Sequence, residues 1–362
     1  MSIVIFIVSL AILILVHEFG HFIVAKKSGI RVDEFGLGFP PRLISKKWGD
    51  TTYTLNAIPF GGFVKIFGED MHSGNISELD RSRSFQYKPK WIQALVLVAG
   101  VSMNLIFAWL LISLGFMLGL PSPVEHSGFG EVRDAHVTIV EILPGSQADK
   151  AGLYPGDTII SVRGGGVTLQ NDTLTLAKIS ELISESKIVD ITYRRGDTPT
   201  QSISVQGTGE VGNRMIGVAL QNIGTLELPV HLALIEGLRT TALLTKETTI
   251  GLAKFLSSVV TLKSDFSQVS GPVGIAGVVG QAQTLGFVHL LSLIALISIN
   301  LAVINLIPFP ALDGGRLLFV GIEAIIRRPI PAKIVRYTNA IGFLLLLTLM
   351  VVVTTNDIFK LL

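Results

Sequence analysis

The amino-acid sequence predicts a multi-pass α-helical membrane protein with four transmembrane helices, a membrane-associated β-hairpin and an inserted extracytoplasmic domain. Hydrophobic residues make up 49% of the 362 positions and charged residues only 15%, whereas a soluble globular chain carries about 25% charge. Four apolar segments are expected to cross the membrane as helices. Between the second and the third of them, short β-like runs alternate with turns rich in Gly and Pro, which is typical of a folded β domain.

The four apolar segments are predicted as the transmembrane helices because a span needs about 20 apolar residues. They comprise residues 3–25, 92–120, 287–307 and 335–353, the last with its most apolar part at 341–353. A cleaved signal peptide has a basic start and a cleavage site of small residues. The first segment has neither feature, so we expect it to be a permanent span.

The distribution of Lys and Arg predicts the topology, since these residues gather on the cytoplasmic side. They follow the first segment, precede the second, and lie between the third and the fourth. Residues 121–228 and both termini are therefore expected outside the cytoplasm. Residues 231–262 carry charges at helical spacing opposite a row of leucines, which favours an amphipathic helix in the membrane interface over a fifth span.

The predicted organisation has four parts. The first two spans lie in 1–120, the extracytoplasmic domain in 121–228, amphipathic interfacial helices in 229–283, and the last two spans in 284–362.

The cytoplasmic loop after the first span has its own β pattern. Strand-like runs at 52–58 and 63–66 flank the turn sequence PFGG at 59–62, which predicts a β-hairpin. The loop is unusually apolar, so we expect it to lie against the membrane or dip into it.

The composition excludes several kinds of site. The chain has no cysteine, so disulfides, iron–sulfur clusters and thiolate zinc sites are excluded. A bound metal ion must therefore be held by His, Asp or Glu. The net charge of +2 and the lack of a long run of Lys and Arg argue against a nucleic-acid partner.

The sequence HEFGH at residues 17–21 carries the predicted chemistry, and it lies inside the first predicted span. Histidines four residues apart face the same side of a helix, so His17 and His21 can bind one zinc ion. Glu18 lies beside them, where it can act as the general base that takes a proton from a zinc-activated water. Ionisable residues inside a span are costly, and three on one turn indicate a function.

A catalytic zinc ion takes three protein ligands and keeps one position open. The second and fourth predicted spans contain no His, Asp or Glu, and the third is followed by NLIPFPALDGG, in which Asp313 is the only acid near the membrane. Pro308 and Pro310 end the helix just before it, which lets the carboxylate turn inward. Basic residues near both motifs place them on the cytoplasmic side, with residues 17–21 about 8–14 Å from that end of their helix.

These paired motifs resemble those of the site-2 protease family of intramembrane zinc metalloproteases, and the resemblance covers most of the chain. It implies that His17, His21 and Asp313 bind Zn²⁺ and that Glu18 is the catalytic base. It also implies that Asn305 holds the substrate or the oxyanion.

The same resemblance extends to two further parts of the chain. The family's Gly-x-x-x-Asn pattern maps to Gly100 and Asn104, which the resemblance places with the substrate or the oxyanion. Residues 144–164, PGSQADKAGLYPGDTIISVRG, resemble the signature of a PDZ domain. A PDZ domain between the second and third spans is similar to the bacterial regulator of sigma-E protease group, here with a single copy. The resemblance implies a multi-pass protein of the bacterial inner membrane.

The predicted function is regulated intramembrane proteolysis of membrane proteins, such as cleavage of an anti-sigma factor or of a signal-peptide remnant. The expected partners are transmembrane protein or peptide substrates and the lipid bilayer, with the PDZ domain contacting substrate ectodomains or regulators. Two other classes stay open, a membrane adaptor with structural zinc and a transporter. An open ligand position argues against the first, and the lack of an internal repeat argues against the second. Asn104 and Asn305 can also serve as interhelical hydrogen-bonding residues, and Gly100 as a packing residue.

Overall fold

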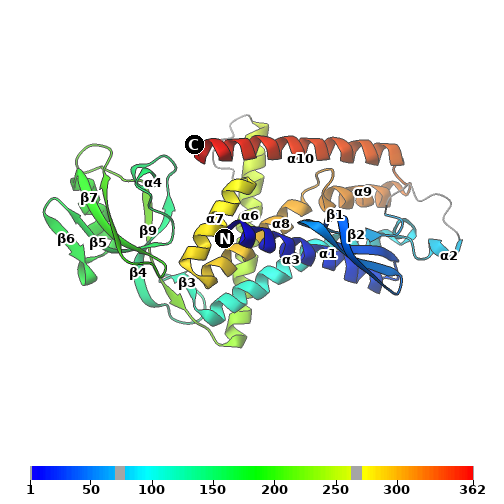
Figure 1. The fold of residues 1–362 in the computed structure, drawn as a ribbon, viewed down its shortest axis with the longest axis horizontal. Coiled ribbons are helices and arrows are strands. Elements are labelled where there is room, and N and C mark those ends of the chain that lie inside the picture. The colour runs from blue at the N-terminus through cyan, green and yellow to red at the C-terminus, as the bar shows by residue number, and fades with distance from the viewer. Residues whose placement is uncertain (1, 70–77, 262–270, 362) are drawn as a thin grey trace. The chain divides into compact units, whose positions relative to one another are not determined.

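The computed structural model describes residues 2–69, 78–261 and 271–361 (Figure 1). By its internal contacts the chain divides into two compact units. One is formed by residues 1–112, 238–280 and 293–362, and the other by residues 113–237 and 281–292.

Four helices in the described part of the chain are long and apolar enough to cross a membrane, as the sequence predicts. They are α1 (Ser2–Lys27), α3 (Lys90–Leu118), α8 (Phe287–Leu306) and α10 (Ala332–Leu361). The last helix extends beyond the predicted 335–353. Its buried Asp357 has a partner, because one carboxylate oxygen accepts a hydrogen bond of 2.8 Å from the backbone N–H of Gly274.

The region between the β domain and the third span is helical. It contains α6 (Val230–Val260) and α7 (Pro272–Leu285), while residues 262–270, including the end of the predicted amphipathic stretch, lie outside the described residues. Helix α6 does not reach the apolar content of a span, which agrees with the sequence pattern. Its position in a membrane interface stays a prediction. Three further elements of the first unit are short or follow the third span, namely α2 (Glu78–Arg81), the 3₁₀ helix η1 (Phe85–Tyr87) and α9 (Asp313–Ile326).

The β-hairpin differs from the prediction. It consists of two long antiparallel strands, β1 (Val32–Trp48) and β2 (Thr51–Ile66), which join at residues 49–50. The turn predicted at 59–62 is wrong, because these residues belong to β2. Strand composition is local, whereas the choice of pairing partner and register depends on the whole sheet.

Both strands bend midway, so that each contributes two segments to the sheet. Residues 34–37 of β1 pair with 52–55 on one side and with 62–65 on the other. The runs 52–58 and 63–66, which were predicted to pair with each other, thus lie on opposite sides of β1. The segment 62–66 has β1 as its one partner among the described strands, so it forms an edge of the sheet.

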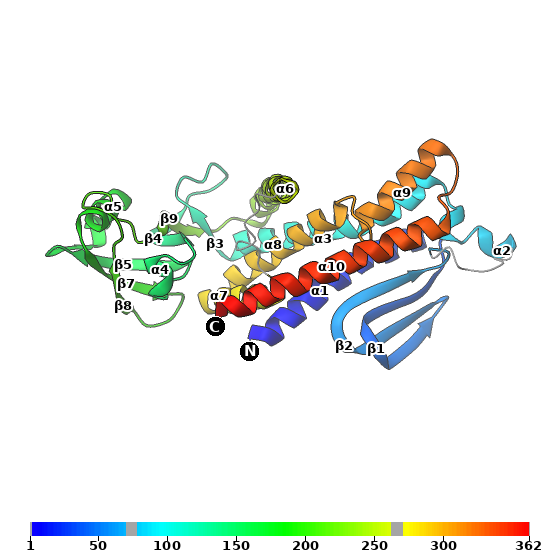
Figure 2. The ribbon, with the colours of Figure 1, turned by 90° about the horizontal axis from the view of Figure 1, so that it is seen from above.

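Aromatic contacts hold the hairpin beside α1 (Figure 2). The ring of Phe22 on α1 lies 5.0 Å from that of Phe35 and 6.0 Å from that of Tyr53, measured between centroids. At the far end of the hairpin, Ile44 and Trp48 are largely exposed. Exposed apolar side chains suit the predicted contact with the membrane.

The second unit contains an antiparallel sheet of seven strands with the order β3-β9-β4-β5-β7-β8 and with β6 paired to β5. Its predicted strands 136–143, 158–162 and 189–194 and its predicted helix 176–186 are confirmed. The strands are β3 (Leu120–Pro123), β4 (Arg133–Ile142), β5 (Asp157–Gly164), β6 (Val167–Gln170), β7 (Ile188–Arg195), β8 (Gln201–Gln206) and β9 (Val218–Leu226).

The helices of this unit complete its core. They are α4 (Gln147–Lys150), the 3₁₀ helix η2 (Asn171–Thr173) and α5 (Leu176–Glu185). Ile179 on α5 is fully buried against Ile139, Val162 and Ile191 of the sheet. The unit is therefore a folded β domain, and its assignment as a PDZ domain stays a prediction.

A buried ion pair ties two strands of this domain together. Both carboxylate oxygens of Asp157 accept hydrogen bonds of 2.7 Å from the guanidinium of Arg195, and these bonds raise the pKa of Arg195. Asp157 also accepts a hydrogen bond from the backbone N–H of Tyr154. Asp157→Ala should destabilise the domain by about 2–4 kcal/mol, because it leaves two donors without their partner.

Hydrogen exchange of the full-length protein measures this effect, with faster exchange expected throughout β5 and β7. The control is Asp197→Ala, which removes the same charge from an exposed position of the domain. Equal exchange rates in the two variants would contradict the prediction.

Candidate metal centre

The site is built around three side chains, the buried His17 and His21 near the start of the chain and the partly buried Asp313 far along it. Helix α1 presents His17 and His21 on one face, with 7% and 6% of their surfaces exposed. The Nε2 atoms of these histidines are 3.2 Å apart, and a carboxylate oxygen of Asp313 lies 2.9 Å from that of His17 and 3.2 Å from that of His21. Three atoms able to bind a metal ion thus converge from positions separated by 296 residues.

The spacing of these atoms fits a zinc ion. Ligands at about 2.0–2.1 Å from zinc in tetrahedral arrangement lie roughly 3.3 Å from one another, close to the separations seen here. The ring of His21 is held in place at its other nitrogen, because Nδ1 lies 2.8 Å from the backbone carbonyl oxygen of Val96 on α3. A hydrogen bond from Nδ1 turns Nε2 toward the metal, as is usual for zinc-binding histidines.

The helix breaks before Asp313, and this residue lies at the start of a new helix. Helix α8 ends at Leu306, and Asp313 opens α9. The two glycines after Asp313 allow the close fold, since a Cβ on Gly314 would lie 2.2 Å from the backbone oxygen of Ile307, and one on Gly315 would lie 2.2 Å from that of Phe309. The break predicted from the two prolines is confirmed, and the new helix is a feature that the sequence analysis missed.

Glu18 lies in a small pocket next to these ligands, which we call the Glu18 pocket. It has a volume of about 210 Å³ and is lined by Glu18, His21, Phe63, Val64, Ile66, Glu69, Leu97, Asp313 and Arg316. Three of these residues belong to the edge segment 62–66 of β2. The sequence analysis did not single them out, because their position depends on how the hairpin folds against α1.

Gly100 on α3 packs directly against the histidine rings. A Cβ at this position would lie 2.3 Å from Nε2 of His21 and 2.8 Å from Cε1 of His17. The absence of a side chain therefore makes room for both rings. This contact differs from the predicted role with the substrate or the oxyanion, which stays a prediction.

Gly100→Ala should reduce zinc content and proteolytic activity by about 10- to 100-fold, because the new methyl group pushes the His21 ring out of position. The matched control is Gly321→Ala on α9, where a Cβ meets no atom within 4 Å. Metal analysis of the purified variants tests the prediction. Full zinc binding by Gly100→Ala would contradict it.

Asn104 is fully buried one turn further along α3, and its side chain touches His17. Its amide nitrogen lies 3.3 Å from Nδ1 of His17, while its amide oxygen is buried and has no hydrogen-bond partner among the described residues. A histidine that binds metal through Nε2 carries its proton on Nδ1 and needs an acceptor there. Rotation of the Asn104 amide group by 180° exchanges its nitrogen and its oxygen, which have nearly the same shape. The amide oxygen then accepts a hydrogen bond from Nδ1 of His17. The backbone oxygen of Asn104 also accepts a 2.8 Å hydrogen bond from Ser298 on α8.

Asn305 is the one predicted polar site residue whose side chain makes no hydrogen bond with any of the described residues. It is partly exposed on the last turn of α8. A role with the substrate is therefore compatible with its position, and it stays a prediction.

Comparison with known proteins places this geometry in a family. Residues 5–349 match the model of peptidase family M50. A protein from Clostridium perfringens that carries the name zinc metalloprotease is 36% identical over 99% of this chain and 98% of its own length. Relatives with the same kind of name from Clostridium acetobutylicum and Nostoc are 32% and 35% identical, covering 99% and 96% of this chain and 97% and 93% of their own lengths. The chain belongs to peptidase family M50, and it is a zinc-dependent metalloprotease.

Proposed function

We propose that this metalloprotease is an intramembrane endopeptidase, which cleaves the transmembrane segments of other membrane proteins. One observation carries the proposal. His17, Glu18 and His21 all lie on α1, a helix that is long and apolar enough to cross a membrane. Charged and metal-binding side chains cost free energy inside a membrane, so their presence in a membrane-spanning helix indicates that they function within the membrane.

The proposed roles follow from the arrangement of the side chains. His17, His21 and Asp313 would hold the zinc ion. When bound, zinc polarises a carbonyl group and lowers the pKa of a water molecule. Glu18 lies in the same pocket as Asp313 and His21, where it takes a proton from the attacking water and delivers it to the leaving amine. Asn104 keeps His17 oriented, and Asn305 is proposed to contact the substrate or the oxyanion.

The edge of the β-sheet suggests how a substrate is presented. A transmembrane helix has its backbone carbonyls in hydrogen bonds and must unwind before attack. Phe63, Val64 and Ile66 line the Glu18 pocket and belong to the edge segment 62–66 of β2. An unwound substrate segment would add to this edge as a further strand, with its backbone held by hydrogen bonds.

The wider arrangement is also part of the proposal. The active site faces the cytoplasmic side of a bacterial inner membrane, and the β domain is an extracytoplasmic PDZ domain. Together with α6 it admits substrates whose ectodomain has already been removed, or it contacts regulators. Suitable substrates include an anti-sigma factor and the remnants of signal peptides.

Cleavage of a short transmembrane peptide by purified protein in detergent tests the proposal. We expect cleavage with zinc present, loss of cleavage after treatment with a chelator, and recovery when zinc is added back. The mass of the products locates the scissile bond, which should lie within the apolar segment. Cleavage that persists in the chelator, or that falls only in soluble regions, would contradict the proposal.

A further inference from the structure

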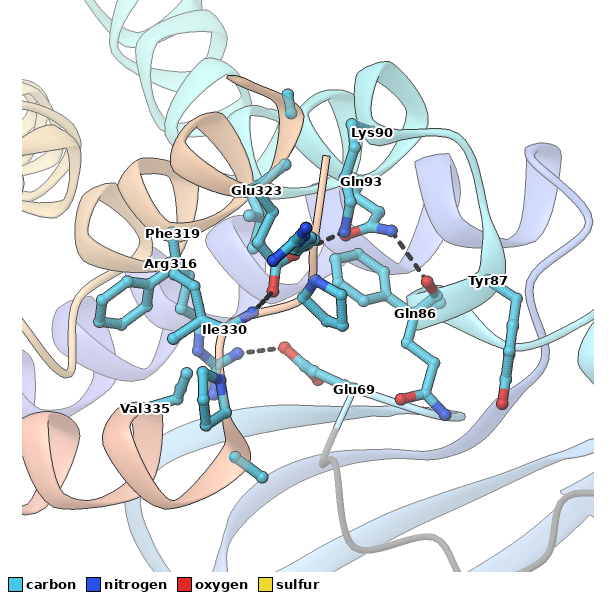
Figure 3. Close-up of a pocket in the computed structure, with 18 of the residues that line it drawn as sticks. Glu69, Gln86, Tyr87, Lys90, Gln93, Arg316, Phe319, Glu323, Ile330 and Val335 are labelled. Atoms are coloured by element: carbon cyan, nitrogen blue, oxygen red, sulfur yellow. Dashed lines mark hydrogen bonds and ion pairs between the residues drawn. The ribbon is translucent and has the colours of Figure 1, made fainter. Parts of the chain in front are cut away.

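A second and larger cavity lies beside the Glu18 pocket in the same unit (Figure 3). Its volume is about 1030 Å³, at the upper end of the range of about 300–1000 Å³ for ligand pockets. Its walls come from α3, α9, the beginning of α10 and residues 327–331 between these last two helices. Glu69, Leu97 and Arg316 line both hollows. We call it the basic cavity, because its lining contains Lys90, Arg316, Arg327, Arg328 and Arg336.

The basic cavity lies at the ends of two helices that are apolar enough to span. Lys90 is the first residue of α3, Val335 is in the first turn of α10, and both line the cavity. The ends of membrane-spanning helices lie at the level of the lipid head groups. The cavity is therefore expected at that level.

The lining of the cavity has an excess of positive charge. Among the described residues, it contains five basic residues and two acidic ones, and both of these acidic residues are already engaged. The carboxylate of Glu69 pairs with Arg316. That of Glu323 accepts hydrogen bonds of 2.6 Å from Lys90 and 2.8 Å from the backbone N–H of Ile330.

These contacts of Glu323 also shape the cavity. Glu323 is 7% exposed, and its two oxygens join the start of α3 to the loop that leads into α10. The wall is thus held in place before any ligand binds. Of the lining residues, Arg327 and Arg328 are exposed and form no ion pair with any described residue, so their charge is available to a ligand.

Apolar side chains complete the lining, among them Phe319, Ile330 and Val335 (Figure 3). A ligand that uses both kinds of surface has an anionic group joined to an apolar chain. An acidic peptide would use only the charged part of the lining. The flank of a membrane segment is also a poor match, because the cytoplasmic ends of such segments more often carry basic residues than acidic ones. Basic pockets between helices at the cytoplasmic side are suited to anionic lipid head groups.

We propose that the basic cavity binds an anionic phospholipid, with its phosphate at Arg327 and Arg328 and its acyl chain along Phe319 and Val335. This site is distinct from the zinc centre. It depends on α3 and α10 crossing the membrane and does not depend on proteolysis, so binding and cleavage are tested separately.

The test measures which lipid the full-length protein retains. Detergent-solubilised protein is incubated with equal amounts of phosphatidylglycerol and phosphatidylcholine that have the same acyl chains, purified again, and analysed for bound lipid by mass spectrometry. We expect several-fold enrichment of phosphatidylglycerol. Arg327→Gln combined with Arg328→Gln should reduce the affinity for phosphatidylglycerol by on the order of tenfold or more, since each basic residue contributes at the membrane surface.

Two further variants separate the cavity from general surface charge. Lys27→Gln combined with Lys333→Gln removes the same charge from the end of α1 and the beginning of α10, outside the lining, and should keep the enrichment. Ala324→Trp narrows the cavity with a bulky side chain without changing its charge and should reduce the enrichment.

The proposal is overturned by no enrichment in the wild-type protein, by an equal loss in both double variants, or by full enrichment in Ala324→Trp. It is also overturned if inorganic phosphate at millimolar concentration displaces the lipid, because the head group alone is then recognised and the acyl chain is not. If an acidic peptide binds in place of the lipid and loses affinity in the arginine variant, the cavity is a peptide site and the lipid proposal fails.

Discussion

Purified Glu18→Gln protein should bind zinc as the wild type does and cleave its substrate at least about 10²- to 10⁴-fold more slowly, the usual contribution of a general base. Glu18 is not among the three converging ligands, so its replacement leaves the metal centre intact. Glutamine has nearly the same shape but cannot take a proton from water. The measurements are zinc content by mass spectrometry and the rate of cleavage of a transmembrane peptide.

A second carboxylate in the same pocket provides a matched control. Glu69 also lines the Glu18 pocket, but it is paired with Arg316 and is therefore poorly placed to act as a base. Glu69→Gln should keep activity within about tenfold of the wild type, because this change disturbs the surroundings of the active site but does not remove the general base. Strong loss in Glu69→Gln with activity retained in Glu18→Gln would assign the base to Glu69 instead.

Removal of Asp313 should cause loss of the zinc ion, which Glu18→Gln is expected to retain. Asp313→Ala leaves only His17 and His21, and zinc affinity should fall by more than about 100-fold, because even residues behind the ligands are worth 10- to 100-fold. Zinc content after equilibration with a buffer of fixed free zinc measures this change. Cleavage should be lost in parallel and recover in part at high zinc concentration.

Two controls distinguish loss of a zinc ligand from misfolding of the variant. Glu18→Gln serves as the control that keeps zinc, and circular dichroism should show equal helix content in the two variants. Wild-type zinc affinity in Asp313→Ala would contradict the assignment and point to a third ligand elsewhere.

Much of this protein follows from local sequence alone. The four spans follow from the length and apolar content of single segments, because the bilayer imposes the same demand on each. The spacing of His17 and His21 places both rings on one face of any helix. The break of the helix before Asp313 follows from Pro308 and Pro310, which cannot continue a helix.

The tertiary structure decided which distant parts meet. The contact of Gly100 and Asn104 with the histidines depends on how α3 packs against α1. The bent hairpin depends on strand partners that no local pattern specifies, and this is why the turn predicted at 59–62 was wrong. The basic cavity likewise exists because α9 meets the beginnings of α3 and α10. Helix formation is encoded within a few turns of chain, whereas these contacts join residues far apart in sequence and are selected only when the whole unit packs.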